Sequence, residues 1–291
     1  MDIVTNITRS SFKHTTKRFI GISKGDYYDI ALARALPNCE FCFLDSLDTP
    51  RHVNVTLDNV NYYQDTNILY REGFDGIIYH NRFSEAVQQY VINIQKETGL
   101  PIMCIDHELP QKHAQTMNHT LNIHSFKKHT DNSIHVPYGV VTDLDGNNDD
   151  RKYNVIAMAP TDMISETLAP SIAVNFDDVV VQYYINDYHF NSSKIYVYMP
   201  QKNTPMSLSV LRALVNGCVV LSLPNDALEE LAPKHVTFVQ NHHSLLPGLN
   251  QMLKDYKFNP EVSTDTLETF PIQKFNEKWQ TVIEGLLNEE N

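Results

Sequence analysis

Three ionisable side chains stand directly after a short apolar segment, residues 102–105, that predicts a β-strand. They are Asp106, His107 and Glu108. Open α/β sheets bind their ligands at the carboxyl ends of the strands. A carboxylate or imidazole held at such a position can take a proton from a substrate hydroxyl group. We therefore predict Asp106, His107 and Glu108 as catalytic candidates, with a polar turn and one capping carboxylate as the alternative.

A second polar group follows another predicted strand, residues 75–79. His80 is the fourth catalytic candidate by the same argument. Asn81 is predicted to contact the acceptor, which is the substrate that carries this hydroxyl group. The alternative for Asn81 is that it caps the helix that follows, because a side-chain oxygen can accept a bond from the first helical N–H groups.

Two loops before predicted helices are candidates for binding a nucleotide diphosphate. The backbone N–H groups of a glycine-containing turn or of a helix start can approach an anion closely, although each loop could equally be an ordinary turn. The first loop precedes a helix that we expect from Asp26 to Leu36, and the second lies between a strand at 194–199 and a helix at 207–216. We call the ligand that carries this diphosphate the donor. The predicted donor-binding residues are Gly21, Lys24, Gly25, Lys202, Asn203, Thr204, Met206, Ser207 and, in the second helix, Arg212.

Basic side chains are concentrated in residues 8–18, which read as a polar loop. Arg9, Lys13 and Arg18 are predicted to bind the acceptor, and a solvated loop is the alternative. The net charge of the chain is -12. This balance disfavours a protein that depends on non-specific phosphate contacts, so any contact with nucleic acid must be confined to a local patch.

No metal or redox site is predicted. Cys39 and Cys42 form a C-x-x-C inside a predicted strand. Their odd offset places the two sulfur atoms on opposite faces of that strand. The acidic run 143–150 lacks the ligand alternation and final glutamate of a calcium loop.

Strands that are apolar throughout alternate with helices along the chain, which predicts parallel sheets covered on both faces. The helix expected at 83–98 and the terminal helix around Phe275 and Trp279 show one apolar stripe each. A chain of 291 residues suits two domains of ~140 residues each. We predict domains at 1–145 and 146–270, with 271–291 as a terminal helix. Further strands are expected at 2–7, 40–45, 154–159, 178–184, 219–223 and 236–239, and further helices at 227–231 and 245–256.

The first residues lack the charged and apolar regions of a signal peptide, and no stretch approaches the ~20 apolar residues that span a membrane. We therefore expect a cytoplasmic protein, in a host cell if the gene is phage-encoded, with no membrane partner.

One block of the second half resembles the donor-binding segment of GT-B glycosyltransferases. In that family a helix with an E-A-x-A-x-G end precedes an apolar strand. Here the corresponding residues are Arg212-Ala213-Leu214-Val215-Asn216-Gly217, followed by Val219-Val220-Leu221. Arg212 replaces the usual Glu, and Thr204 stands where an earlier Glu is expected. Residues 135–140, with Pro137, Gly139 and Val140, are similar to the P-x-G-V that closes the first domain in that family.

The resemblance implies two Rossmann-like α/β domains that face each other across a cleft, with the C-terminal helix crossing back to the first domain. It implies transfer of a sugar, with retention, from a nucleoside-diphosphate sugar, UDP-linked by preference. Mg²⁺ or Mn²⁺ is an optional cofactor that the sequence does not require.

The element order most resembles that of phage DNA glucosyltransferases, which implies 5-hydroxymethylcytosine in DNA as acceptor. Residues 106–108 are similar to their H-D-H-like cluster, and the loop from Gly21 to Gly25 to their glycine loop. Other readings stay open: a glycosyltransferase for glycans or small molecules, a nucleotide-sugar epimerase, and a non-catalytic nucleotide- or metabolite-binding protein. The last is favoured by the two missing Glu residues.

Overall fold

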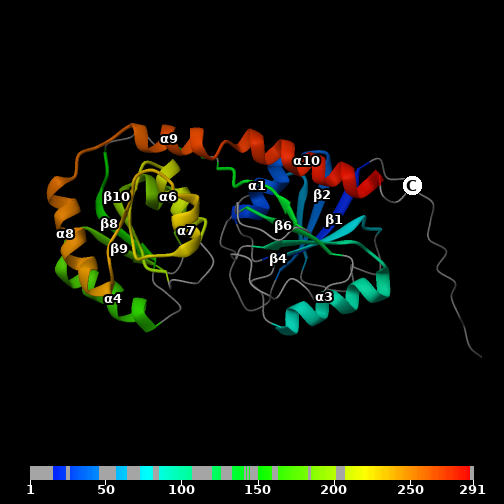
Figure 1. Ribbon diagram of the computed structural model, residues 1–291, viewed down its shortest axis with the longest axis horizontal. Helices are drawn as coiled ribbons and strands as arrows, with labels where there is room; N and C mark the ends of the chain where they lie inside the picture. Colours follow the sequence, from blue (N-terminus) through cyan, green and yellow to red (C-terminus); the bar gives the residue numbers. More distant parts are fainter. Residues whose placement is uncertain are drawn as a thin grey trace, which may run out of the picture.

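Two separate parallel β-sheets organise the chain, one in each half (Figure 1). The computed structural model describes residues 16–23, 27–45, 57–63, 73–80, 85–106, 120–125, 133–140, 142, 144, 150–158, 163–182, 185–200 and 207–288. Within these residues no helix is both long enough and apolar enough to cross a membrane.

The first sheet has the strand order β3-β2-β1-β4-β5-β6-β7, and all its neighbouring strands are parallel. The order changes direction between β1 and β4, which is the topological switch point where such sheets bind ligands. Its strands are β1 Lys17–Ser23, β2 Cys39–Asp45, β3 Val60–Tyr63, β4 Gly76–His80, β5 Ile102–Asp106, β6 Thr120–His124 and β7 Ser133–His135; the helices of this half are α1 Tyr27–Ala35 and α3 Glu85–Thr98.

The second sheet has the order β12-β11-β10-β8-β9, again all parallel, with its switch point between β8 and β10. Together the two sheets confirm the predicted pair of α/β domains. The strands are β8 Tyr153–Met158, β9 Val179–Gln182, β10 Ser193–Tyr198, β11 Val219–Ser222 and β12 Val236–Phe238; the helices are α4 Met163–Asn175, α5 Asp187–Asn191, α6 Ser209–Val215, α7 Asp226–Leu231, α8 Leu245–Asp255 and α9 Glu261–Thr269.

The terminal helix α10, Ile272–Asn288, returns to the first domain, as predicted (Figure 1). It packs on α1. Trp279 is fully buried, and its indole Nε1 donates a hydrogen bond to the hydroxyl of Tyr28 at 3.2 Å. Phe275 packs edge-on against the same Tyr28 ring, with 5.3 Å between centroids. This apolar face of α10 explains the stripe seen in the sequence.

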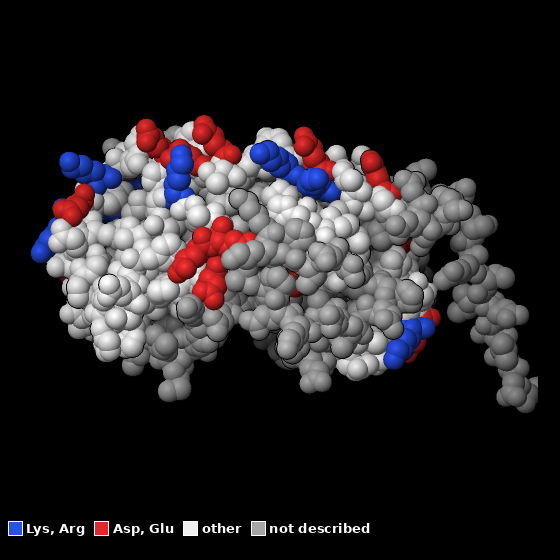
Figure 2. Space-filling view, viewed as in Figure 1, with Lys and Arg blue, Asp and Glu red and all other residues white. Residues whose placement is uncertain are grey.

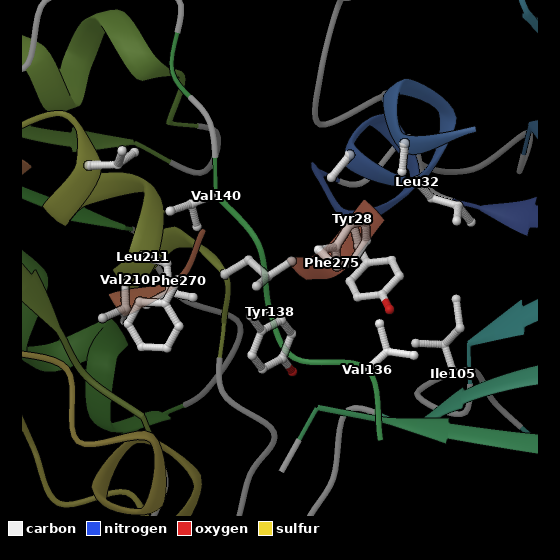
Figure 3. Packing of buried hydrophobic residues seen from close by; sticks show 14 of the residues in the cluster. Tyr28, Leu32, Ile105, Val136, Tyr138, Val140, Val210, Leu211, Phe270 and Phe275 are labelled. Atoms are coloured by element: carbon white, nitrogen blue, oxygen red, sulfur yellow. The ribbon is translucent and has the colours of Figure 1, made fainter. Parts of the chain in front are cut away.

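One apolar cluster continues from the first domain into the second (Figure 3). It passes through the junction where the segment after β7 meets the segment between α9 and α10. There the N–H of Val140 donates to the carbonyl of Phe270 at 3.0 Å, and Val140 forms a parallel bridge with Pro271. A Cβ added to Gly139 would lie 2.5 Å from the Cβ of Phe275. The glycine of the P-x-G-V therefore permits a close approach between α10 and the junction.

Several local predictions differ from the structure. Lys17 and Arg18, expected in a loop, begin β1. The predicted strand at 2–7 lies outside the described residues, and the domain boundaries stay predictions. Strands β1, β3, β6 and β7 and helices α4, α5 and α9 were not predicted.

Candidate functional site

The carboxyl edge of the first sheet is turned toward the second domain. The last residue of β7, His135, leads directly into residues 136–140, which form the junction. Tyr28, in the first turn of α1, packs edge-on against Tyr138 of the junction, with 6.4 Å between ring centroids. Because a helix that follows a parallel strand starts at that strand's carboxyl end, the carboxyl end of β1 lies at the junction as well.

The carboxyl edge of the second sheet points to the same junction. Helix α6 runs antiparallel to α9: the hydroxyl of Ser263 donates to the carbonyl of Val215 at 2.6 Å. At the other end of α6, Val210 and Leu211 pack beside Phe270 in the shared apolar cluster (Figure 3). The chain continues from Phe270 to α10 on the first domain. The start of α6, and with it the carboxyl end of β10, is therefore directed at the first domain.

Asp106 ends β5 and begins a row of ionisable residues along the carboxyl edge of the first sheet. It lies opposite His124, the last residue of β6, which in turn lies opposite His135, the last residue of β7. The rings of His124 and His135 are 5.6 Å apart between centroids. His124 is buried, whereas Asp106 and His135 are partly exposed. Asp106 is thus placed where it was predicted, and the two histidines were missed.

His80 differs from the prediction of a catalytic group. Its Nε2 lies 2.8 Å from the carboxylate Oδ1 of Asp29 on α1, and the side chains are 2% and 0% exposed. His80 is opposite Ile105 in the sheet, so its side chain lies on the other face from Asp106. The buried pair fastens α1 to the end of β4, and a substrate cannot reach either group without movement of the chain.

A chain of hydroxyl groups connects the end of β10 to the start of α6. The N–H of Ser207 donates to the hydroxyl of Tyr198 at 2.9 Å. The hydroxyl of Ser209 donates to that of Ser207 at 2.8 Å, and it lies 2.9 Å from the hydroxyl of Tyr196. Burial raises the pKa of Tyr198 to about 12, so this hydroxyl stays protonated at neutral pH. Ser207 therefore lies at the switch-point edge, and its contact with a donor stays a prediction.

The side chain of Arg212 forms an ion pair within the second domain. Its guanidinium forms an ion pair with Asp187 of α5, with Nε 2.9 Å from Oδ1, and lies 5.8 Å from the ring centre of Phe190. Helix α5 comes directly before β10, so this pair lies toward the amino end of that strand. The expectation that Arg212 lines the donor side is corrected to an ion pair between two helices.

Gly21 and Arg18 are also corrected. Gly21 is buried in the middle of β1, where an added Cβ would lie 2.5 Å from the ring of Phe43. It permits close packing within the first domain and does not belong to a phosphate loop. Arg18 lies at the amino end of β1, away from the site edge, with its Nε 2.8 Å from a carboxylate oxygen of Glu40. An acceptor contact by Arg18 is therefore wrong for this edge.

The remaining predicted residues fall outside the described part of the chain. Among the residues that are described, no group of three or more His, Cys, Asp or Glu side chains could hold a metal ion. All four cysteines are buried thiols. The predicted residues that lie outside are Arg9, Lys13, Lys24, Gly25, Asn81, His107, Glu108, Lys202, Asn203, Thr204 and Met206.

Comparison with known proteins identifies the architecture. No family model matches the sequence, and a search of curated proteins finds no match. Among solved structures, sucrose-phosphate synthase from Thermosynechococcus elongatus is 11% identical over 94% of this chain and 100% of its own, with a TM-score of 0.62. HepE from Anabaena, in complex with UDP and glucose, is 9% identical over 94% of this chain and 100% of its own, with a TM-score of 0.63. A putative UDP-N-acetylglucosamine 2-epimerase from Listeria monocytogenes is 9% identical over 94% and 97%, with a TM-score of 0.54. The chain therefore has the GT-B fold of two facing α/β domains.

Proposed function

We propose that this protein is a glycosyltransferase that uses a nucleoside-diphosphate sugar, with UDP as the nucleotide. The observation that carries the proposal is that the carboxyl edges of both sheets are directed at one junction. Two ligands bound at these edges would therefore meet. A protein of the same fold, HepE, binds UDP together with glucose, which supports a nucleotide on one side and a sugar close to it.

The donor nucleotide belongs, in this proposal, at the switch point of the second sheet between β8 and β10. Tyr198 ends β10 there, and its hydroxyl holds the backbone of Ser207 in place. In the block that resembles the family, Thr204 and Arg212 stand where its Glu residues are expected. Because Arg212 pairs with Asp187, recognition of the nucleotide rests on the edge itself and not on the middle of α6.

Asp106 is the proposed base on the acceptor side. In the transfer, the acceptor oxygen forms a bond to the anomeric carbon of the sugar. The bond from that carbon to the diphosphate oxygen breaks, and its electron pair leaves on the diphosphate. The proton of the acceptor hydroxyl passes to the carboxylate of Asp106. The partial exposure of Asp106 at the end of β5 gives it the access that this step requires.

A nucleotide-binding protein without catalysis is the second candidate. It is favoured by the ion pair of Arg212 with Asp187, which occupies the place of an expected donor-binding Glu. An epimerase is the third, because a putative nucleotide-sugar epimerase shares the fold.

The three candidates are separated by two measurements. Calorimetric titration with UDP tests the nucleotide site, and release of UDP from UDP-glucose and UDP-N-acetylglucosamine tests turnover. We expect UDP binding, UDP release, and a loss of release of about 100-fold in Asp106→Asn at unchanged UDP affinity. Asp255→Asn, an exposed position on α8, is the matched control. Absence of UDP binding would overturn the proposal, binding without release would favour the binding protein, and an epimerised nucleotide sugar would identify an epimerase.

The proposed acceptor is 5-hydroxymethylcytosine in DNA, supported by the element order. Two of the basic residues behind this idea now have other partners, because Lys17 pairs with Asp75 and Arg18 with Glu40. Figure 2 shows the acidic side chains of α7 beside the border of the two domains, which disfavours a DNA contact on that part of the surface. Incubation with a radiolabelled nucleotide sugar and DNA, with and without hydroxymethylcytosine, decides this: transfer to glycans or small molecules alone would end the DNA hypothesis.

A further inference from the structure

The row formed by Asp106, His124 and His135 is unusual for its position in the sheet. Strands of a parallel sheet are covered on both faces and are normally apolar. Here three neighbouring strands each end in an ionisable residue, and the residues are aligned in register. Neighbouring strands lie about 4.8 Å apart, so each of these side chains is close to the next. The ring distance of 5.6 Å between the two histidines agrees with this spacing.

The three side chains share one face of the sheet. Residues in register on parallel strands point to the same side, and so do residues two apart on one strand. Cys104, two residues before Asp106, packs with Ile94 of α3 on that face. Burial, and then the nearby carboxylate of Asp106, raises the pKa of the Cys104 thiol to about 12. The carboxylate of Asp106 therefore acts electrostatically on side chains of the same face of the sheet, which also carries His124.

We propose that His124 is a positioning residue that couples Asp106 to His135 electrostatically, so that the protonation of each of the three groups at the acceptor side depends on the other two. This inference rests on the proposed function, in which Asp106 takes the acceptor's proton. His124 is 5% exposed and lies between two partly exposed groups, so it acts through its neighbours and not on the substrate. A carboxylate in register on the neighbouring strand favours the imidazolium form of His124, and a second imidazolium at His135 disfavours it.

The titratable groups that face His124 are few in the described part of the chain. Asp106 and Cys104 face it from β5, and His135 faces it from β7. Tyr79 of β4 follows one strand further, opposite Cys104. Helix α3 contributes the apolar side chains Val91 and Ile94 to this face. Cys104 stays neutral at neutral pH, so Asp106 and His135 dominate the charge that His124 experiences.

The first test is titration of the histidine rings by NMR in the free protein, which needs no substrate. Asp106→Asn is expected to lower the pKa of His124 by roughly 1 unit, and His135→Gln is expected to raise it. His243→Gln is the matched control. The ring centroids of His243 and His242 are 3.9 Å apart on the exposed surface of the second domain, far from the row, so this change should leave the titration of His124 unchanged. If the pKa of His124 is the same in the wild type, in Asp106→Asn and in His135→Gln, the proposed coupling is overturned.

The second test separates positioning from structure. His124→Gln is expected to reduce kcat for UDP release from UDP-glucose by about tenfold and to shift its pH profile, with KM for the donor within twofold. A loss of kcat with an unshifted pH profile would reduce His124 to a structural role and overturn the proposal. Should His124→Gln fail to fold, His135→Gln gives the same readout from a partly exposed position. Coupled titrations without UDP release in the wild type would refute the proposed function and the catalytic part of this inference, while the coupled row itself would stand.

Discussion

Replacing Gly139 by Ala tests whether the close approach at the junction holds the terminal helix on the first domain. The added Cβ would lie 2.5 Å from the Cβ of Phe275 and 3.0 Å from the Cα of Ile272. One of these neighbours is backbone and the other is the root of a buried ring, so neither can move aside freely. The φ angle of Gly139 is not positive, unlike those of Gly99 and Gly217, so the expected cost is steric alone.

The magnitude follows from two opposing effects. Overpacking of a filled site costs about 1–3 kcal/mol. The lower entropy of the unfolded chain returns about 0.4–1 kcal/mol when Gly becomes Ala. Because the nearest contact falls far below van der Waals distance, we place the first value at its upper end and expect a net loss of about 2 kcal/mol. For a chain of this size that corresponds to a fall in Tm of about 3–4 °C.

The assay is urea unfolding followed by tryptophan fluorescence. The chain has a single tryptophan, Trp279, and it is buried where α10 meets α1, so its emission reports on the affected contact. Gly285→Ala is the matched control: Gly285 is exposed in α10 with nothing within 4 Å of an added Cβ. It should stabilise by about 0.5–1 kcal/mol. A Gly139→Ala protein as stable as the wild type would refute the reasoning about the close approach.

Three further outcomes are expected. Arg151→Met should lower the free energy of unfolding by about 2–4 kcal/mol, because the Arg151 guanidinium donates to the buried carbonyls of Phe190, Ser193 and Asn216; urea unfolding checks it, and a loss under 1 kcal/mol would contradict it. Asp29→Ala should cost about 3–5 kcal/mol by leaving His80 without its buried partner, as measured by the same method, and an unchanged midpoint would be incompatible with that pair. The hydrogen bond from His235, followed by that from Lys234, lowers the pKa of Asp265 below its usual 3.8, so this carboxylate stabilises the fold above the unfolded-state pKa and the contribution disappears as pH falls through the folded-state pKa. The difference in urea midpoint between wild type and Asp265→Asn should accordingly be present at pH 7 and close as the pH falls below 3.8, and a difference that is independent of pH would argue against the ion pair.

The elements that could be predicted are those whose burial leaves a local pattern. Strands β4, β5 and β10 are covered on both faces and are apolar along most of their length. Helices α3 and α10 bury one stripe, and Gly99 ends α3 with a positive φ of 71°. In these segments the local sequence pattern and the tertiary environment favour the same secondary structure. Such segments can be predicted from sequence.

The missed elements lack such a pattern for identifiable reasons. Strand β7 has three residues, and β6 alternates polar with apolar side chains, which is atypical of a parallel sheet. Helix α4 contains Pro170, which argues against a helix in sequence, and α5 has only five residues. The candidate site was the least predictable part. The alignment of Asp106 with His124 and His135 depends on strand register between distant segments, and no local spacing in the sequence indicates it.

The structure also shows how α6 accommodates Arg212 at the position where the GT-B pattern that this block resembles has a Glu. A guanidinium in place of a carboxylate in the helix would be a buried unpaired charge, which is costly unless a partner is supplied. Asp187 on α5 supplies it, and Arg212 keeps only 10% of its side-chain surface exposed. Asn216 directly follows the same helix; its side chain accepts a hydrogen bond from Thr142 after the junction, and its carbonyl accepts one from Arg151. The positive charge of Arg212 is thus neutralised inside the second domain by Asp187. The contacts of Asn216 hold α6 against the segment that enters from the first domain. The start of α6, where Ser207 is held by the hydroxyl of Tyr198, is left with the geometry that a bound donor would need. The replacement of Glu by Arg212 is therefore compatible with the proposed donor side, for which the carboxyl end of β10 is the proposed position of the nucleotide.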